Sequence, residues 1–134
     1  MTKDVVAVQV DEPFSHVESK MRTHHIRHLP VVNEQNQVVG IITQRDFYHA
    51  YSPRKTLEGN DFFDEDELDQ IILKNAMTAD PRTLRPNDTI AEVIKIMAEH
   101  KYGALPVVDE KKRLLGIVSQ IDILKFIEIG RAHV

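Results

Sequence analysis

The two ends of this chain repeat each other. Residues 1–58 align with residues 77–134 without a gap, so each residue in the first window has a counterpart 76 positions further on. Conservative pairs such as Ile42/Val118 lie between the identical ones. The identical pairs include Met1/Met77, Thr2/Thr78, Val17/Val93, Met21/Met97, His24/His100, Leu29/Leu105, Pro30/Pro106, Gly40/Gly116 and Asp46/Asp122. Self-similarity at a fixed offset indicates one supersecondary block that is used twice.

Each block is predicted to have the order strand, helix, strand, strand, helix. Short apolar runs between polar turns predict the strands, and apolar residues at helical spacing predict the helices. The expected strands are Val5–Val8, Leu29–Val32 and Val38–Thr43, then Arg82–Leu84, Leu105–Val108 and Leu114–Ser119. The expected closing helices are Gln44–Tyr51 and Gln120–Ile129. Because a two-stranded ribbon is marginally stable alone, the two blocks are expected to share one core.

The first helix of each block carries recognisable start signals. In the second copy Thr89 and Glu92 have the spacing of a capping box, in which each side chain satisfies a free amide. The apolar residues that follow predict one buried face: Ile90, Val93, Ile94 and Met97. In the first copy Pro13 is expected at the first helical position, followed by a similar stripe of Phe14, Val17 and Met21.

The sequence divides into a first repeat with the start of a linker (1–58), an acidic linker and helix (59–76) and a second repeat (77–134). Gly59-Asn60-Asp61 predicts a turn. The acids Asp64 to Glu67 are expected at a helix start, where the helix dipole favours negative charge, although a partner-binding face is an alternative. Met1-Thr2-x-Asp4 matches Met77-Thr78-x-Asp80, so the chain is expected either to lack a leading helix or to begin downstream of its natural start.

Composition narrows the function. The net charge of −4 gives no basic field for nucleic acid, which makes that partner unlikely. Apolar runs are far shorter than the roughly 20 residues that span a bilayer, and no leader opens the chain. We therefore expect a cytoplasmic protein without a membrane partner. The absence of cysteine excludes disulfides and thiolate chemistry.

The motif Gly-x-x-Ser/Thr-x-x-Asp ends a strand in both copies, at Gly40–Asp46 and Gly116–Asp122. A helix start offers free amides to a phosphate, a hydroxyl adds a donor, and an aspartate can accept hydrogen bonds from a ribose diol. The same spacing is also close to a capping box. The motif alone leaves both interpretations open.

These features together resemble the CBS domain, named for cystathionine β-synthase. The strand Leu-Pro-Val-Val, the hairpin and the aspartate motif occur in that order, twice. The segment His24–Pro30 and the Ser52-Pro53 step look like the CBS pair of AcuB-type acetoin-utilisation proteins. The resemblance implies an α/β (α+β) fold in which two β-α-β-β-α repeats pack with pseudo-two-fold symmetry into one Bateman module. It also implies a homodimer that regulates a partner protein and is not itself an enzyme.

The resemblance implies two clefts for an adenine nucleotide, each built from both repeats. The better-equipped cleft would use Arg27, Thr43, Gln44, Asp46, Thr83, Leu84, Ala104 and Pro106. The weaker cleft would use Ala7, Val8, His28, Pro30, Ser119 and Asp122. The ranking follows because Ala7 stands where the other cleft has the hydroxyl of Thr83, and Gly103 stands where it has the cation of Arg27. Arg27 could instead be a surface charge or an ion-pair partner of the linker.

The leading hypothesis is a regulatory module that senses AMP, ADP, ATP or S-adenosylmethionine and modulates an unidentified protein. The alternative is a structural dimerisation or docking module with empty clefts. No cofactor is expected, and no catalytic group, since hydrolase and phosphate-loop motifs are missing. His24 and His28 have the spacing of a helical metal pair, but a strand is expected to begin near His28, so no metal site is predicted.

Overall fold

The computed structural model describes Met1 and residues 3–134; Thr2, part of the repeated Met-Thr-x-Asp motif, lies outside the described residues. Contacts divide the chain into two compact units. We call them the first-repeat unit (Val6–Asn33 and Val39–Pro81) and the second-repeat unit (Met1–Val5, Glu34–Val38 and Arg82–Val134). These units of contact do not follow the linear order of the repeats, because short segments of the first repeat belong to the second-repeat unit.

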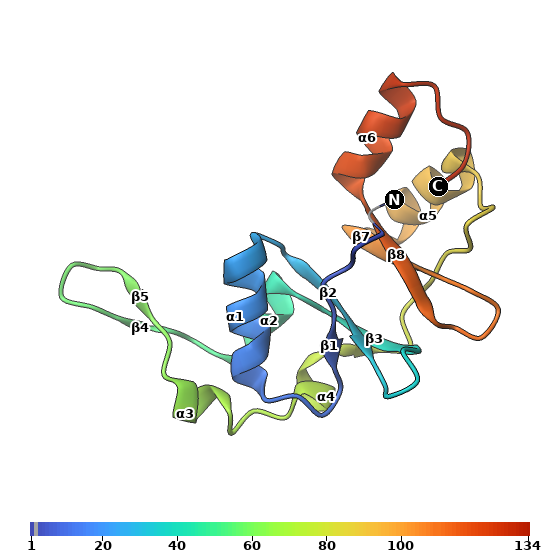
Figure 1. Cartoon of the computed structure of the whole chain (residues 1–134). Helices are drawn as coiled ribbons and strands as arrows, with labels where there is room; N and C mark the ends of the chain where they lie inside the picture. The colour runs from blue at the N-terminus through green and yellow to red at the C-terminus, as the bar shows by residue number, and fades with distance from the viewer. Residues whose placement is uncertain (2) are drawn as a thin grey trace. The chain divides into compact units, whose positions relative to one another are not determined.

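A four-stranded sheet in the order β1-β2-β3-β6 organises the first-repeat unit. The strands are β1 (Val8–Gln9), β2 (His28–Val32), β3 (Val38–Thr43) and β6 (Thr78–Ala79). β1 runs parallel to β2, whereas β6 pairs antiparallel with β3. Helices α1 (Phe14–His24) and α2 (Gln44–Ala50) lie side by side next to these strands (Figure 1).

The first strand of each block is shorter and later than predicted. Val5–Val8 was expected, but the ladder holds only Val8 and Gln9, opposite Val31 and Val32. In the second block the expected Arg82–Leu84 reduces to one bridge between Leu84 and Val107. A proline in the partner strand explains why each ladder does not extend toward the N-terminus. The next partners would be Pro30 and Pro106, which have no N–H to donate to a ladder.

The linker differs from the single expected helix. Two one-turn helices form, α3 (Glu65–Leu68) and α4 (Leu73–Ala76). Leu68 and Leu73 are both buried, and in one continuous helix residues five apart would point to different faces. The break lets both leucines enter the same core. The acids at the helix start are confirmed, since the Asp64 side chain caps α3 by accepting from the Glu67 amide at 3.1 Å.

A small hairpin that was not predicted precedes these helices. β4 (Arg54–Lys55) pairs antiparallel with β5 (Asp61–Phe62), and the pair projects from the rest of the first-repeat unit (Figure 1). The turn expected at Gly59 is present, and Gly59 has a φ of 85°, which glycine adopts without strain. Each of these strands has only two residues, and both are exposed. Such short strands show no alternation of apolar and polar residues, so the sequence pattern does not predict them.

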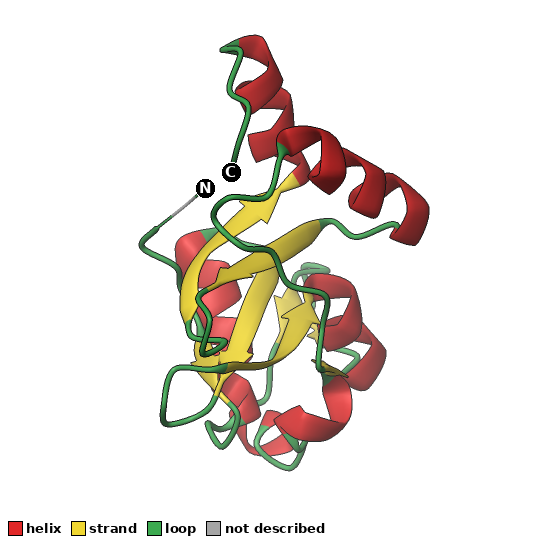
Figure 2. Cartoon of the chain, turned by 90° about the vertical axis from the view of Figure 1, so that its right-hand side faces the viewer, coloured by secondary structure: helices red, strands yellow, loops and turns green. Residues whose placement is uncertain are grey.

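The second-repeat unit contains α5 (Ile90–His100), β7 (Ala104–Val108), β8 (Leu114–Ser119) and α6 (Gln120–Glu128). Figure 2 shows α5 and α6 as neighbouring red helices next to their hairpin. The chain end returns to the start of α5, where the Ile90 amide donates to the Ala132 carbonyl at 2.9 Å. The Thr89 hydroxyl accepts from the Glu92 amide at 3.2 Å, so one of the two expected capping-box bonds is present in the described chain.

Buried side chains form one apolar cluster in each unit. The first cluster includes Phe14, Val17 and Met21 as predicted. The second includes Ile90, Val93 and Met97, whereas Ile94 is 39% exposed and does not belong to the buried face.

The hairpin turns of the two repeats meet within the second-repeat unit. The Val38 amide donates to the Lys112 carbonyl and the Leu114 amide to the Asn36 carbonyl, each at 2.9 Å. Gln37 and Arg113 form an isolated antiparallel bridge between these bonds. The segment 34–38 thus joins the second-repeat unit, although it lies in the first repeat of the sequence.

Candidate functional site

Thr43 ends β3 and begins α2, and its side chain forms a closed pair with Asp46. The Asp46 amide donates to Thr43 Oγ1, and Asp46 Oδ2 accepts from the Thr43 amide, both at 3.0 Å. This is a complete capping box. The capping interpretation of the motif is therefore confirmed for this copy, with both side chains held in one orientation.

Thr43 and Asp46 each keep a hydrogen-bonding group that the cap does not use. The Thr43 hydroxyl acts as an acceptor in the cap, so its own O–H remains able to donate. Asp46 uses Oδ2, and Oδ1 has no hydrogen-bond partner among the described residues. Both groups are partly exposed. A donor hydroxyl and an acceptor carboxylate thus lie at one junction, a pair that suits a phosphate and a diol.

Arg27 and His28 lie beside this junction. The Gln44 amide donates to the Arg27 carbonyl at 2.8 Å, which fixes the strand start against the helix start. Arg27 is exposed. Burial lowers the pKa of His28, the positive charge of Arg27 lowers it further, and the Asp46 carboxylate opposes both. The structure therefore brings Arg27, His28, Gln44 and Asp46 together within one unit.

The second junction repeats the first closely. The Asp122 amide donates to Ser119 Oγ at 3.2 Å, and Asp122 Oδ2 accepts from the Ser119 amide at 2.9 Å. The Gln120 amide donates to the Gly103 carbonyl at 3.1 Å, as Gln44 does to Arg27. The two aspartates thus have the same local geometry. The residue beside each junction differs, since Arg27 carries a cation and Gly103 has no side chain.

The other predicted residues also fall into two groups by unit. In the second-repeat unit Leu84, Ala104 and Pro106 are buried and Thr83 is half-buried. The Leu84 amide donates to the Pro106 carbonyl at 2.8 Å. In the first-repeat unit Val8 and Pro30 are buried, and Lys20 Nζ donates to the Ala7 carbonyl at 2.7 Å. Each predicted cleft draws on both units, so the two clefts remain predictions.

The backbone separates His24 from His28, as expected from a strand that begins near His28. α1 ends at His24, His25 follows as a left-handed cap, and His28 begins β2. His24 and His28 therefore do not share a helical turn. His100 ends α5 in the same way. Within the described chain no three metal-ligating side chains cluster, and none of its helices has the length and apolar character that crossing a membrane requires.

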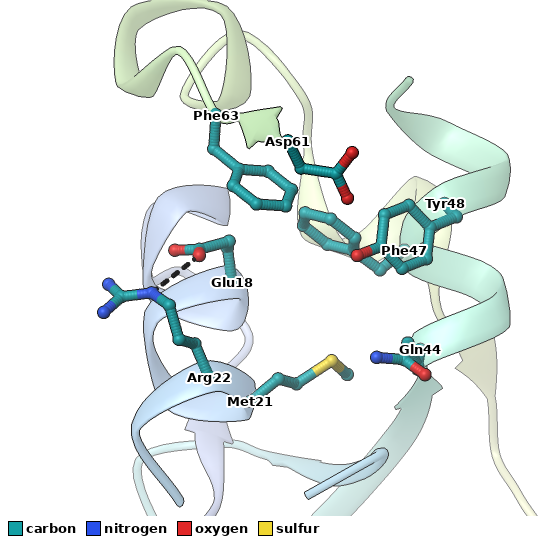
Figure 3. Close-up of a pocket in the computed structure, with 8 residues that line it drawn as sticks. All are labelled: Glu18, Met21, Arg22, Gln44, Phe47, Tyr48, Asp61 and Phe63. Atoms are coloured by element: carbon teal, nitrogen blue, oxygen red, sulfur yellow. Dashed lines mark hydrogen bonds and ion pairs between the residues drawn. The ribbon is translucent and has the colours of Figure 1, made fainter. Parts of the chain in front are cut away.

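A pocket of about 190 Å³ in the first-repeat unit was not anticipated (Figure 3). It lies between α1, α2 and the end of the β4–β5 hairpin, and Glu18, Phe47, Tyr48 and Phe63 are among its lining residues. Comparison of the two repeats holds a signal for it. The aromatic residues Phe47 and Tyr48 align with the aliphatic residues Ile123 and Leu124 in the other copy. A comparison that looks only for matching residues does not reveal this difference.

Two copies of one block, each with a capped Ser/Thr-x-x-Asp junction between its last strand and its last helix, define this protein as a tandem-repeat pair. The chain belongs to the CBS domain family, whose model matches residues 1–53 and 72–129. The resemblance drawn from the repeated motifs is thereby confirmed, and so is the α+β fold of a CBS pair.

Known proteins of this family cover nearly all of the chain. The uncharacterized protein MJ1225 of Methanocaldococcus jannaschii is 32% identical over 126 residues, 94% of this chain and 45% of that protein; its crystal structure superposes with a TM-score of 0.79. The acetoin utilization protein AcuB of Vibrio cholerae is 26% identical, with a TM-score of 0.75 over 97% of this chain and 87% of that one.

A further structural relative is the cytosolic domain of the Mg²⁺ channel MgtE, solved in complex with ATP. It is 26% identical, with a TM-score of 0.71 over 93% of this chain and 46% of that one. The chain spans less than half the length of the first curated relatives that it matches. Several of these are enzymes, including inosine-5'-monophosphate dehydrogenase and homoserine O-acetyltransferase.

Proposed function

We propose that this chain is a regulatory module that binds an adenine nucleotide and thereby alters the activity of a partner protein. AMP, ADP, ATP and S-adenosylmethionine are the candidate ligands. The chain has no catalytic role in this proposal. Where its relatives are enzymes, the matching segment is under a quarter of their length, which fits a regulatory part attached to a separate catalytic domain.

The junction at Thr43 and Asp46 carries the proposal. Its unused donor and acceptor atoms suit a phosphate oxygen and a ribose diol, and Arg27 adds a planar guanidinium that can bind two phosphate oxygens at once. The MgtE relative, solved with ATP, supports a nucleotide as the ligand class. The ligand would act by binding one arrangement of the module more tightly than another, which shifts the population toward it.

We further propose that the cleft of Asp46 binds more tightly than the cleft of Asp122. The two capping boxes are alike, so the difference comes from their surroundings. Arg27 provides a cation that Gly103 lacks, and Thr83 provides a hydroxyl that Ala7 lacks. The residues assigned to the better cleft are Arg27, Thr43, Gln44, Asp46, Thr83, Leu84, Ala104 and Pro106.

The matched caps allow a controlled test by calorimetric titration with each nucleotide. Asp46→Asn and Asp122→Asn should each cost about 1 kcal/mol of stability through the weakened cap. Only Asp46→Asn should weaken the tighter binding step, by about tenfold or more, because a charged acceptor is lost. Arg27→Gln should weaken ATP binding more than AMP binding, since fewer phosphate oxygens lose a partner in AMP.

Two results would contradict the proposal. If Asp122→Asn weakens binding and Asp46→Asn does not, the ranking of the clefts is wrong. If no nucleotide binds or raises the melting temperature at millimolar concentration, the nucleotide function is wrong, because a ligand of the native state must stabilise it. The alternative, a structural dimerisation or docking module, then becomes the better hypothesis.

Self-association as a homodimer is also part of the proposal. Ile121, Leu124 and Ile127 are 64%, 68% and 53% exposed along α6. A contiguous exposed apolar stripe on a helix commonly marks an interaction surface. Leu124→Glu should shift light-scattering mass toward the monomer without unfolding the chain. Lys125→Glu, a change at an exposed neighbouring residue, is the control and should leave the mass unchanged.

A further inference from the structure

The pocket of the first-repeat unit has a mixed acidic and aromatic wall. Glu18 and Met21 reach it from α1, Phe47 and Tyr48 from α2, and Phe63 from the segment after β5 (Figure 3). All of these elements belong to one compact unit. Its volume of about 190 Å³ is below that of a typical drug-sized site. The pocket fits a single small group.

The internal repeat shows which features of this pocket the fold does not require. The counterparts of Glu18 and Arg22 are Ile94 and Ala98, and the counterparts of Phe47 and Tyr48 are Ile123 and Leu124. Both repeats nevertheless build the same helix pair and hairpin. The carboxylate and the rings are thus properties of one copy, and a core needs neither of them at these positions.

Glu18 is a largely buried carboxylate with an exposed partner. Its side chain is 13% exposed, while that of Arg22, which donates to it through Nε at 2.9 Å, is 66% exposed. The bond uses Oε1 of Glu18, and Oε2 has no hydrogen-bond partner among the described residues. Asp61 on the opposite wall accepts from the exposed Lys55 through Oδ1. Arg22 also borders the pocket, and its guanidinium points away from the rings (Figure 3).

The rings complete a surface that favours positive charge. Tyr48 lies edge-on to Phe47 with ring centroids 5.3 Å apart, and Phe63 lies 6.1 Å from Phe47. Aromatic faces attract cations, most strongly where water is partly excluded. We propose that this pocket is a binding site for a small organic cation, a guanidinium or alkylammonium group, held between the Glu18 carboxylate and the rings of Tyr48 and Phe63. Gln44, which is also assigned to the Asp46 cleft, borders this pocket, while the other residues assigned to the nucleotide clefts do not line it.

The methionines allow a direct test on the intact chain. Met21 lines the pocket, and its repeat counterpart Met97 lies on α5 in the other unit. With carbon-13 in the methionine methyl groups, butylguanidinium and butylammonium are titrated at constant ionic strength. The Met21 resonance should shift to saturation while that of Met97 stays in place. Butylurea, a neutral molecule of the same shape as butylguanidinium, should shift neither.

Two variants separate binding from a structural ion pair. Glu18→Gln should weaken the cation about tenfold because the charged acceptor is lost. Arg22→Gln should leave affinity equal or tighter, because it frees Glu18 and removes a competing cation. Phe63→Leu should weaken binding without changing the charge. Glu99→Gln, an exposed acid on α5, is the control and should behave as the wild type.

The proposal is overturned if Met21 does not shift or if all four methionines shift alike. It is also overturned if Glu18→Gln and Arg22→Gln weaken binding equally, since that pattern belongs to an ion pair with a structural role. If the variants change the sedimentation mass and leave cation binding unaffected, the pocket is covered by a second copy and the assignment is wrong. The Met97 resonance reports in each sample that the chain is folded.

Discussion

The pKa of His28 depends on its burial and on the charges of two neighbouring residues. His28 is the first residue of β2, and its ring lies close to the charges of Arg27 and Asp46. Burial and the Arg27 charge disfavour the protonated imidazole more than the Asp46 charge favours it, so the pKa of His28 lies below its ordinary value. The same few side chains that form the proposed phosphate and ribose contacts thus also control this histidine.

The lowered pKa of His28 predicts a stability that decreases in mild acid. The unfolded chain binds a proton at the ordinary histidine pKa of about 6.5, and the folded chain binds it only at lower pH. Stability due to this group is therefore constant above about pH 6.5 and falls as the pH drops below it. Urea midpoints at about pH 7.5 and about pH 5.5 measure the loss, and His28→Gln should make it smaller.

The exposed His49 on α2 provides the comparison. His49→Gln, a change at an exposed residue of α2, is the control for the loss of one histidine. An equal flattening by the two variants would show that the dependence comes from general charge and not from the site of His28.

At the scale of elements, β3 and β6 meet through a glycine. Gly40 lies opposite Ala79 in the ladder, and a Cβ at position 40 would overlap the Met77 sulfur and lie 3.0 Å from its Cε. Gly40 recurs as Gly116 and Met77 as Met1, so the repeat preserves both members of the contact.

Gly40→Ala should destabilise the chain by about 1–3 kcal/mol, the usual cost of overpacking. Met77→Ala in the same chain should recover most of that loss, because the obstructing side chain is removed. A double-mutant cycle by urea unfolding measures the coupling, which should reach at least about 0.5 kcal/mol. A penalty of the same size in both backgrounds would show that backbone conformation, and not Met77, excludes alanine.

At the scale of the whole molecule, the chain crosses between compact units within a single strand. β3 begins at Val38 in the second-repeat unit and continues from Val39 in the first-repeat unit. The hydrogen bonds of Val38 and Leu114 tie the segment 34–38 to the turn of the β7–β8 hairpin. The first repeat thus contributes a turn to the unit built mainly by the second.

This arrangement predicts slow hydrogen exchange at two specific amides. Val38 and Leu114 should show protection factors similar to each other, because their bonds open in one event. The amide of Leu57, at the fully exposed tip of the β4–β5 turn, is the fast reference. Exchange of Val38 as fast as that of Leu57 would mean that the turn contact is not maintained in solution.

Local information explains what could be predicted. The hairpin strands Val38–Thr43 and Leu114–Ser119 were predicted with the observed bounds, because polar turns and strand-forming residues mark them within a few positions. The capped junctions at Asp46 and Asp122 were also visible, since a capping box spans only four residues. The repeat then made each prediction twice, which strengthened both.

The sequence by itself determined the repeated block, its order of elements and the residues at the two strand-to-helix junctions, because these depend on neighbours in the chain. Only the tertiary structure decided that the linker breaks between Leu68 and Leu73, that segment 34–38 joins the second-repeat unit, and that Glu18 and Phe63 line one pocket. Those features depend on which distant surfaces compete for the same buried space, and that competition leaves no periodic trace in the sequence.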